Sequence, residues 1–228
     1  MKDKISKSYE QSKNIYDDIL TSNKWWSKLY LWLFWNGVDD NEIQKRLLEH
    51  IPDDFSGKLL DVPVGTAVFT YNKYKKLKNA DIRCLDYSTE MLAQAKMRFY
   101  ENSINNVDTI QGDVGDLPFE DETFDIVLCM NGIHAFPNKE QAYKEMHRVL
   151  KKGGKFLVSL YVEKEYIISD LLVKLVLSKK GWFSPPFETI SSLKNRISKN
   201  YVIEDFYSQK SKSIIYFVAT KKGDSYEI

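Results

Sequence analysis

The hydrophobic and polar positions of this chain predict strands and helices in alternation from residue 58 onward. Short apolar runs such as "KLLDVPV" and "FDIVLCMN" are separated by segments whose apolar residues recur at helical spacing. An amphipathic helix is expected before them, at 41–51. Ser88 is suited to cap one of the later helices, and Gly153-Gly154 should end another. We expect strands at 58–64, 81–87, 107–113, 124–131 and 155–162, with helices at 67–78, 89–103 and 138–151.

This order predicts an α/β fold with a doubly wound, mostly parallel sheet, because strands that alternate with helices are joined by right-handed crossovers. The C-terminal region departs from the alternation. There, "YVIEDFYSQ" and "IIYFVATKK" are separated only by "KSKS", so they should form an antiparallel pair at one sheet edge. We expect one domain with a helical N-terminal cap at 1–51, a ligand-binding core at 58–162, a lid insertion and helix at 163–200, and the strand pair at 201–222.

Composition narrows the partners and the compartment. Lys and Arg total 33 and Asp and Glu total 32, so a net charge of +1 argues against a nucleic-acid partner. The two cysteines, Cys84 and Cys129, lie in apolar runs and fit a reducing compartment. The N-terminus has no signal-peptide pattern, and no uncharged stretch reaches the roughly 18–20 residues of a membrane span. These features predict a cytoplasmic protein without a membrane span.

Polar residues that directly follow strands are the candidates for chemistry, because ligands bind beyond the carboxyl ends of parallel strands. In the first such turn, Gly65 lets the backbone approach a ligand, Thr66 offers a hydroxyl, and Asp61 can accept from an amino-bearing group. Asp86 ends the next strand, where an acid can accept from both hydroxyls of a ribose. Asp113 ends the third strand, next to Val114. Neither a G-x-G-x-x-G fingerprint nor a Walker A loop is present, which argues against NAD, FAD or a P-loop nucleotide.

Four segments together resemble the successive motifs of class I S-adenosylmethionine-dependent methyltransferases: "LLDVPVGTA", "CLDYSTEML", "QGDVGDLPFEDETFDIVLCMNGIHAF" and "EMHRVLKKGGKFLVS". Within that family the chain is most similar to the ubiquinone/menaquinone-biosynthesis-type small-molecule enzymes. The resemblance covers about residues 58–162 and implies a Rossmann-like fold with S-adenosyl-L-methionine as cofactor and S-adenosyl-L-homocysteine as product. The family's first loop commonly reads D-x-G-x-G-[ST]-G. Here Pro63 and Ala67 replace the outer glycines, and Gly65 is kept.

The resemblance implies a role for each residue that matches a motif position. Tyr87 and Met91 are assigned to the adenine, and the alternative is that both are core residues. The implied contacts are Asp61, Pro63, Gly65 and Thr66 around the methionine part, Asp86 at the ribose, Tyr87, Met91, Asp113 and Val114 at the adenine, Met130 through its backbone beside the amino-acid moiety, and Tyr16 on an N-terminal helix that covers the cofactor.

His134, in the loop "NGIHAF", matches a position that often carries histidine in the family and borders the transferable methyl. An imidazole could remove a proton from an acceptor hydroxyl or amine, which makes His134 the candidate catalytic residue. The alternative is a histidine that only shapes the pocket. His50 and His147 fit structural positions, and the histidines and cysteines show no metal-ligand spacing, so no metal is expected.

Two segments outside the core are expected to form the acceptor site: the N-terminal region with the Trp25–Trp35 cluster, and residues 164–190. We expect both to be mobile without ligand and to close over it, with Tyr16 and Trp182 in contact. The alternatives for the tryptophans are packing onto the sheet and a weak interfacial contact with a membrane.

The function predicted from these features is methyl transfer to a small, apolar or aromatic acceptor. The altered first loop leaves a second possibility, a non-catalytic S-adenosylmethionine-binding protein that regulates or assists a partner. A third, methylation of rRNA or tRNA, is disfavoured by the balanced charge and by the lack of an N-P-P-Y-type motif.

Overall fold

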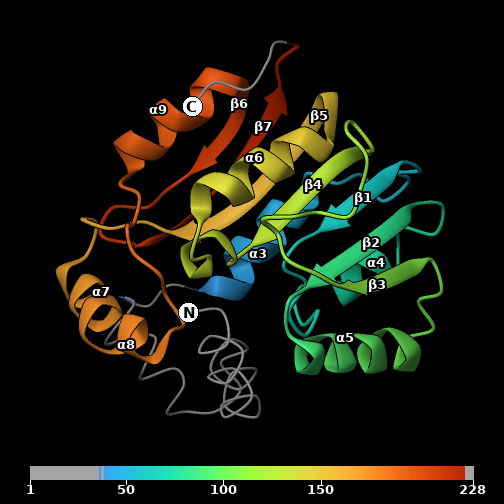
Figure 1. Ribbon diagram of the computed structural model, residues 1–228, viewed down its shortest axis with the longest axis horizontal. Helices are drawn as coiled ribbons and strands as arrows, with labels where there is room; N and C mark the ends of the chain where they lie inside the picture. Colours follow the sequence, from blue (N-terminus) through green and yellow to red (C-terminus); the bar gives the residue numbers. More distant parts are fainter. Residues whose placement is uncertain (1–35, 37–38, 224–228) are drawn as a thin grey trace.

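The computed structural model describes residue 36 and residues 39–223. Tyr16, the Trp25–Trp35 cluster and most of the expected N-terminal cap lie outside the described residues. Within the described part, one sheet has the strand order β3-β2-β1-β4-β5-β7-β6 (Figure 1). Its strands are β1 Lys58–Asp61, β2 Asp81–Asp86, β3 Val107–Gln111, β4 Phe124–Met130, β5 Leu150–Tyr161, β6 Tyr201–Tyr207 and β7 Ile214–Lys221.

Strand pairing confirms the predicted mixed sheet. Strands β1 to β5 pair in parallel, β7 pairs antiparallel with β5, and β6 pairs antiparallel with β7 at the edge. The chain runs outward from β1 through β2 to β3 and then returns to place β4 on the other side of β1. The strand order therefore reverses between β1 and β4, where a doubly wound sheet opens a crevice for ligands.

Helices cover both faces of the sheet (Figure 1). Residues of α3, α4, α5 and α7 belong to one buried apolar cluster, and residues of α6 and α9 belong to the other. Both clusters include strand residues, as expected when alternate side chains of a strand face opposite sides. The helical segments are α3 Asp40–Glu49, α4 Tyr71–Tyr74, α5 Thr89–Glu101, the 3-10 turn Ile133–Ala135, α6 Lys139–Val149, α7 Ile167–Leu172, the π-helical turn Val173–Leu177, α8 Ser178–Lys180 and α9 Ile190–Asn200.

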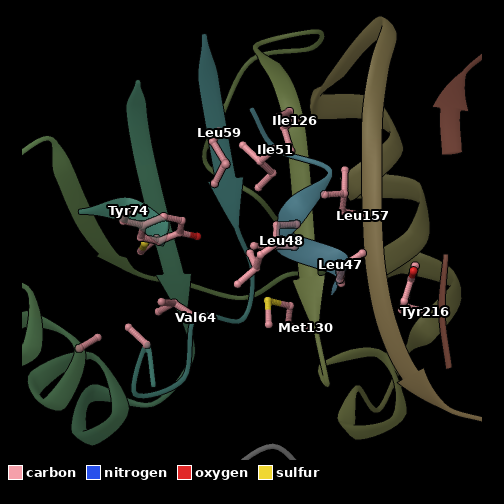
Figure 2. Close-up of a cluster of buried hydrophobic side chains, with 14 of the residues drawn as sticks. Leu47, Leu48, Ile51, Leu59, Val64, Tyr74, Ile126, Met130, Leu157 and Tyr216 are labelled. Carbon is pink, nitrogen blue, oxygen red and sulfur yellow. The ribbon is translucent and has the colours of Figure 1, made fainter. Parts of the chain in front are cut away.

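Helix α3 forms where the amphipathic pattern predicted it. Its N-cap Asp39 accepts a hydrogen bond from the backbone N–H of Glu42. Leu47 and Leu48 point from the helix onto the sheet, where Figure 2 shows them near side chains of β1, β4 and β5 such as Ile126 and Leu157. This packing places the start of α3 close to the ends of β4 and β5. Among the described helices, none has the length and apolar character needed to cross a membrane.

The helix predicted at 67–78 is wrong in extent, because only Tyr71–Tyr74 is α-helical. Ala67 has a φ of 57°, in the left-handed region, and cannot belong to a right-handed helix. The residues that follow it, Val68, Phe69 and Thr70, are β-branched or aromatic and have low helix propensity. The first crossover is therefore a long turn with one short helix.

The boundary predicted at Gly153-Gly154 is also wrong. Helix α6 already ends at Val149, and β5 begins at Leu150 and runs through both glycines. Pairing with β4 shifts register between Phe124 and Ile126, and Gly153 has a φ of 72°. Glycine here permits an irregularity inside a strand, because it adopts positive φ without a steric penalty.

Candidate functional site

A cavity opens at the carboxyl ends of β1, β2 and β4, where the strand order reverses. It is lined by residues 61–70, 85–88, 91, 112–114, 130–131 and 135–137. Every cofactor-binding residue predicted in the described part of the chain is among them: Asp61, Pro63, Gly65, Thr66, Asp86, Tyr87, Met91, Asp113, Val114 and Met130. Strand topology brings these residues together from distant parts of the sequence. Their contact with a cofactor stays a prediction.

The first turn keeps the backbone shape that a close ligand needs. Gly65 has a φ of 56°, and a Cβ atom built there would meet nothing within 4 Å, so its missing side chain leaves open space on the cavity wall. Ala67 replaces a glycine of the family's motif, yet it keeps the left-handed conformation at a cost of roughly 1–2 kcal/mol. Pro63 packs so closely on Gly132 that a Cβ there would overlap the proline ring. The altered loop is thus held by the loop after β4.

Asp86 joins the first two turns of the site. Its Oδ2 accepts a hydrogen bond from the backbone N–H of Gly65 at 2.8 Å, and its Oδ1 accepts from the N–H of Ser88 at 2.9 Å. The side chain is buried, and this burial raises the pKa of Asp86 to about 6 despite the backbone donors. Burial destabilises the charged form of Asp86, so further hydrogen-bond donors such as ribose hydroxyls would stabilise this carboxylate.

Asp61 is the deepest acid of the cavity, with 1% of its surface exposed. The Tyr74 hydroxyl donates to its Oδ2 at 2.7 Å. Burial raises the pKa of Asp61 to about 7, and the charge of Asp86 adds to the rise, whereas the Tyr74 hydrogen bond opposes it. Tyr74 could not be identified from the sequence, since nothing in the local pattern links an aromatic residue of a short helix to the end of β1.

The adenine side of the predicted site consists of an exposed ring and a tight turn. Tyr87 is 42% exposed at the rim, so core packing does not explain it, whereas Met91 is buried. Asp113 Oδ1 accepts from the N–H of Gly115 at 2.9 Å, which fixes the turn after β3. Val114 lines the cavity beside it. These positions fit the predicted contacts with an adenine ring.

His134, the candidate base, is buried behind the cavity and is not one of the residues that line it. Its Nδ1 accepts from the backbone N–H of Tyr161 at 3.2 Å, and its ring stacks on Phe183 with centroids 4.2 Å apart. Burial, helped by the nearby charge of Lys139, lowers the pKa of His134 to about 3. An imidazole with this pKa is a weak base. The geometry therefore favours the alternative role, in which His134 shapes the pocket.

The segment that follows β5 is hydrogen-bonded to the loop that carries His134. The backbone N–H of Ser184 donates to the carbonyl of His134 at 2.8 Å, its hydroxyl donates to the carbonyl of Ala135, and Lys139 Nζ donates to the Ser184 carbonyl. Trp182 packs against the apolar cluster and is not one of the cavity-lining residues. Closure of this segment over a ligand stays a prediction.

Affinity for S-adenosylhomocysteine is expected to rise with pH between about 5 and 7.5. Ribose hydroxyls hydrogen-bond best to an ionised Asp86, whose pKa is about 6, so the bound state should release a proton. Below pH 6 this linkage weakens binding by up to roughly tenfold per pH unit. Calorimetry at pH 6 in two buffers of different ionisation enthalpy measures the released proton. Asp86→Asn should reduce the proton release at pH 6, and any pH dependence that remains is assigned to Asp61, whose pKa is about 7. A flat wild-type profile would contradict the assignment of Asp86.

Comparison with known proteins agrees with this geometry. Residues 60–158 match a family model described as a methyltransferase domain. The demethylmenaquinone methyltransferase of Alkalihalophilus pseudofirmus is 39% identical over 97 residues, which cover 42% of this chain and 41% of that protein. The Bacillus subtilis protein of the same name is 36% identical over 98 residues, 42% of each chain. The matches thus span about two-fifths of the length of these two relatives.

Among solved structures, a Thermotoga maritima S-adenosylmethionine-dependent methyltransferase, described as a possible histamine N-methyltransferase, superimposes with a TM-score of 0.64. It covers 94% of this chain and 99% of its own at 19% identity, so it confirms the Rossmann-like fold alone. The predicted methyltransferase core is confirmed for residues 60–158, which match the methyltransferase-domain model, and the curated relatives are named as methyltransferases.

Proposed function

We propose that this chain, whose residues 60–158 match a methyltransferase domain, is a class I S-adenosylmethionine-dependent enzyme that transfers a methyl group to a small, apolar or aromatic acceptor. The observation that carries the proposal is the cavity at the reversal of strand order, where Gly65, Asp86 and Asp113 meet. In this proposal residues 58–162 supply the cofactor site, and residues 163–200 with the N-terminal cap cover it. A small molecule is favoured over a nucleic acid because the charges of the chain balance.

The acceptor is proposed to be of the quinone type, in its reduced, hydroxyl-bearing form. Two observations support this class. The curated relatives are named for demethylmenaquinone, and the cavity wall near the end of β4 carries the apolar residues Ala135, Phe136 and Pro137. A flat ring can pack on such a wall, with few polar groups needed to orient it.

Each predicted cofactor contact has a defined task. Asp86 accepts from the ribose hydroxyls, and the open face of Gly65 lets the methionine part approach the backbone. When bound, the cofactor supplies a methyl group that is already activated on a sulfonium. The protein then has to align the acceptor and exclude water, and orientation alone can contribute several kcal/mol. The low basicity of His134 is therefore compatible with catalysis.

A second candidate function is a cofactor-binding protein without turnover. Two features favour this non-catalytic function. Pro63 and Ala67 replace glycines of the first loop, and His134 is not among the residues that line the cavity. Both functions are proposed for the cytoplasm, since Cys84 and Cys129 are buried and unpaired, as suits a reducing compartment.

Turnover separates the two candidates. Purified protein with S-adenosylmethionine labelled in its methyl group is expected to transfer label to 1,4-naphthohydroquinone, kept reduced by dithionite, and Asp86→Ala is expected to remove the transfer. The labelled product is extracted into organic solvent and counted. Binding of S-adenosylhomocysteine without transfer to any member of a panel of hydroxylated aromatic rings would favour the non-catalytic function. Failure to bind S-adenosylhomocysteine at all would contradict both.

A further inference from the structure

A buried hydrogen-bond network connects the start of helix α3 to the loop that follows β4. Gln44 Nε2 donates to Asp40 Oδ1 at 2.6 Å, and Ser159 Oγ on β5 donates to Gln44 Oε1 at 2.7 Å. Asn131 Nδ2 donates to the other oxygen of Asp40 at 3.0 Å. Asp40, Gln44 and Ser159 are 7%, 1% and 0% exposed. The network crosses from the helix to two neighbouring strands and ends at a cavity-lining residue, Asn131.

The network fixes the orientation of the Asn131 amide. A carboxylate only accepts hydrogen bonds, and both oxygens of Asp40 are met by side-chain amides, so Asn131 must turn its NH₂ group toward Asp40. The orientation of the Gln44 amide is fixed too, because its oxygen accepts from Ser159 and its nitrogen donates to Asp40. The backbone of Asn131 is held as well, since its N–H donates to the Ser159 carbonyl at 2.9 Å.

This orientation leaves Asn131 Oδ1 as a buried acceptor without a hydrogen-bond partner among residue 36 and residues 39–223. Such an atom costs about 1–3 kcal/mol, a cost that a ligand donor can offset. Asn131 lines the cavity next to Met130, whereas Asp86 lies on the far side of β1, because β1 separates β2 from β4 in the sheet. Asn131 therefore lies at the end of the cavity that is away from the predicted ribose site.

We propose that Asn131 Oδ1 accepts a hydrogen bond from a ring hydroxyl of the methyl acceptor and that Asp40, through Asn131, is the positioning residue. This inference rests on the proposed function and defines the polar part of its acceptor site. A neutral amide oxygen binds a hydroxyl without removing its proton, so Asn131 orients the ring and selects hydroxyl-bearing acceptors over their ethers.

Two stable probes test the proposal: 1-naphthol, which carries a hydroxyl, and 1-methoxynaphthalene, which has the same ring and no donor. With saturating S-adenosylhomocysteine, the wild type is expected to bind 1-naphthol roughly three- to tenfold more tightly, as for one added hydrogen bond. Asn131→Leu should bind the two probes equally. Asn195→Leu, an exposed site on α9, is the matched control and should keep the preference. Equilibrium dialysis measures the affinity of each of the three proteins for each of the two probes.

Asp40→Asn supplies a second reading in case Asn131→Leu does not fold. Its new NH₂ group can donate to Asn131 Oδ1 after the Asn131 amide turns over. The preference for 1-naphthol should then vanish, although the side chains at positions 40 and 131 both remain and stay hydrogen-bonded to each other. A role of Asp40 in stability alone would leave the preference unchanged.

The possible outcomes separate this inference from the proposed function. Loss of the preference in both variants, with S-adenosylhomocysteine affinity within about twofold of wild type, supports the proposal. A preference that persists in both variants, or equal wild-type affinities for the two probes, overturns it. A tenfold loss of S-adenosylhomocysteine affinity in Asn131→Leu would also overturn it, because the oxygen would then serve the cofactor. Only failure of the wild type to bind S-adenosylhomocysteine would remove the proposed function itself.

Discussion

Replacing Asp86 by alanine is expected to weaken S-adenosylhomocysteine binding by roughly 10- to 100-fold, because hydrogen bonds to a charged acceptor contribute about 1.5–3 kcal/mol. The loss has two physical sources. The ribose hydroxyls lose a buried carboxylate, and the backbone N–H of Gly65 loses the acceptor that holds the first turn. Isothermal titration calorimetry at pH 7.5 measures the change. An unchanged affinity would remove Asp86 from the cofactor site.

Two further variants show whether the Asp86 effect is local. Asp108→Ala removes an exposed aspartate of the neighbouring strand β3 that pairs with Arg83 of β2, and this variant should bind as the wild type does. Asp86→Asn keeps the size of the side chain and loses its charge. Burial raises the pKa of Asp86 to about 6, so the unfolded chain loses its proton first as pH rises from about 4 to 6, and stability falls over that window. At pH 7.5 the Asn variant loses the cost of the buried charge, but its NH₂ group cannot accept from one of the two backbone N–H groups, Gly65 or Ser88. It is expected to bind more weakly than the wild type, and thermal unfolding shows whether it is folded.

Replacing Gly65 by alanine is expected to reduce S-adenosylhomocysteine affinity by roughly tenfold or more, since one methyl group forced into a filled site costs about 1–3 kcal/mol. The free protein has room for the new Cβ atom, which would meet nothing within 4 Å. That same open space is where the methionine part is predicted to approach the backbone. Calorimetry gives the affinity, and thermal unfolding shows that the variant is folded.

Gly153→Ala is the matched control for Gly65→Ala. Gly153 also has a positive φ, 72° against 56°, and a Cβ atom there also meets nothing within 4 Å. Both variants carry the backbone cost of a left-handed alanine, roughly 1–2 kcal/mol, so both should lose similar stability. Only Gly65→Ala should lose cofactor affinity. Equal affinities in the two variants would show that the first turn does not contact the cofactor.

The strand and helix order could be predicted from the sequence because it depends on local patterning. A continuous apolar run such as 124–131 is typical of a central strand, and amphipathic spacing such as that at 41–51 is typical of a helix that packs on one face of a sheet. Local pattern was insufficient where the backbone departs from regular geometry. Ala67 has a positive φ that alanine disfavours, and of the helix predicted at 67–78 only the four residues Tyr71–Tyr74 are helical.

By itself the sequence determined the α/β class, the strand ends that supply Asp61, Asp86 and Asp113, and the motifs of a methyltransferase core, since these follow from chain order and residue type. The tertiary structure decided which distant groups meet. It placed Tyr74 on Asp61, turned His134 away from the cavity, and joined Asp40 to Asn131 across 91 positions of the chain. Such contacts depend on the angle at which a helix packs across a sheet, and the spacing of residues along the sequence does not determine that angle.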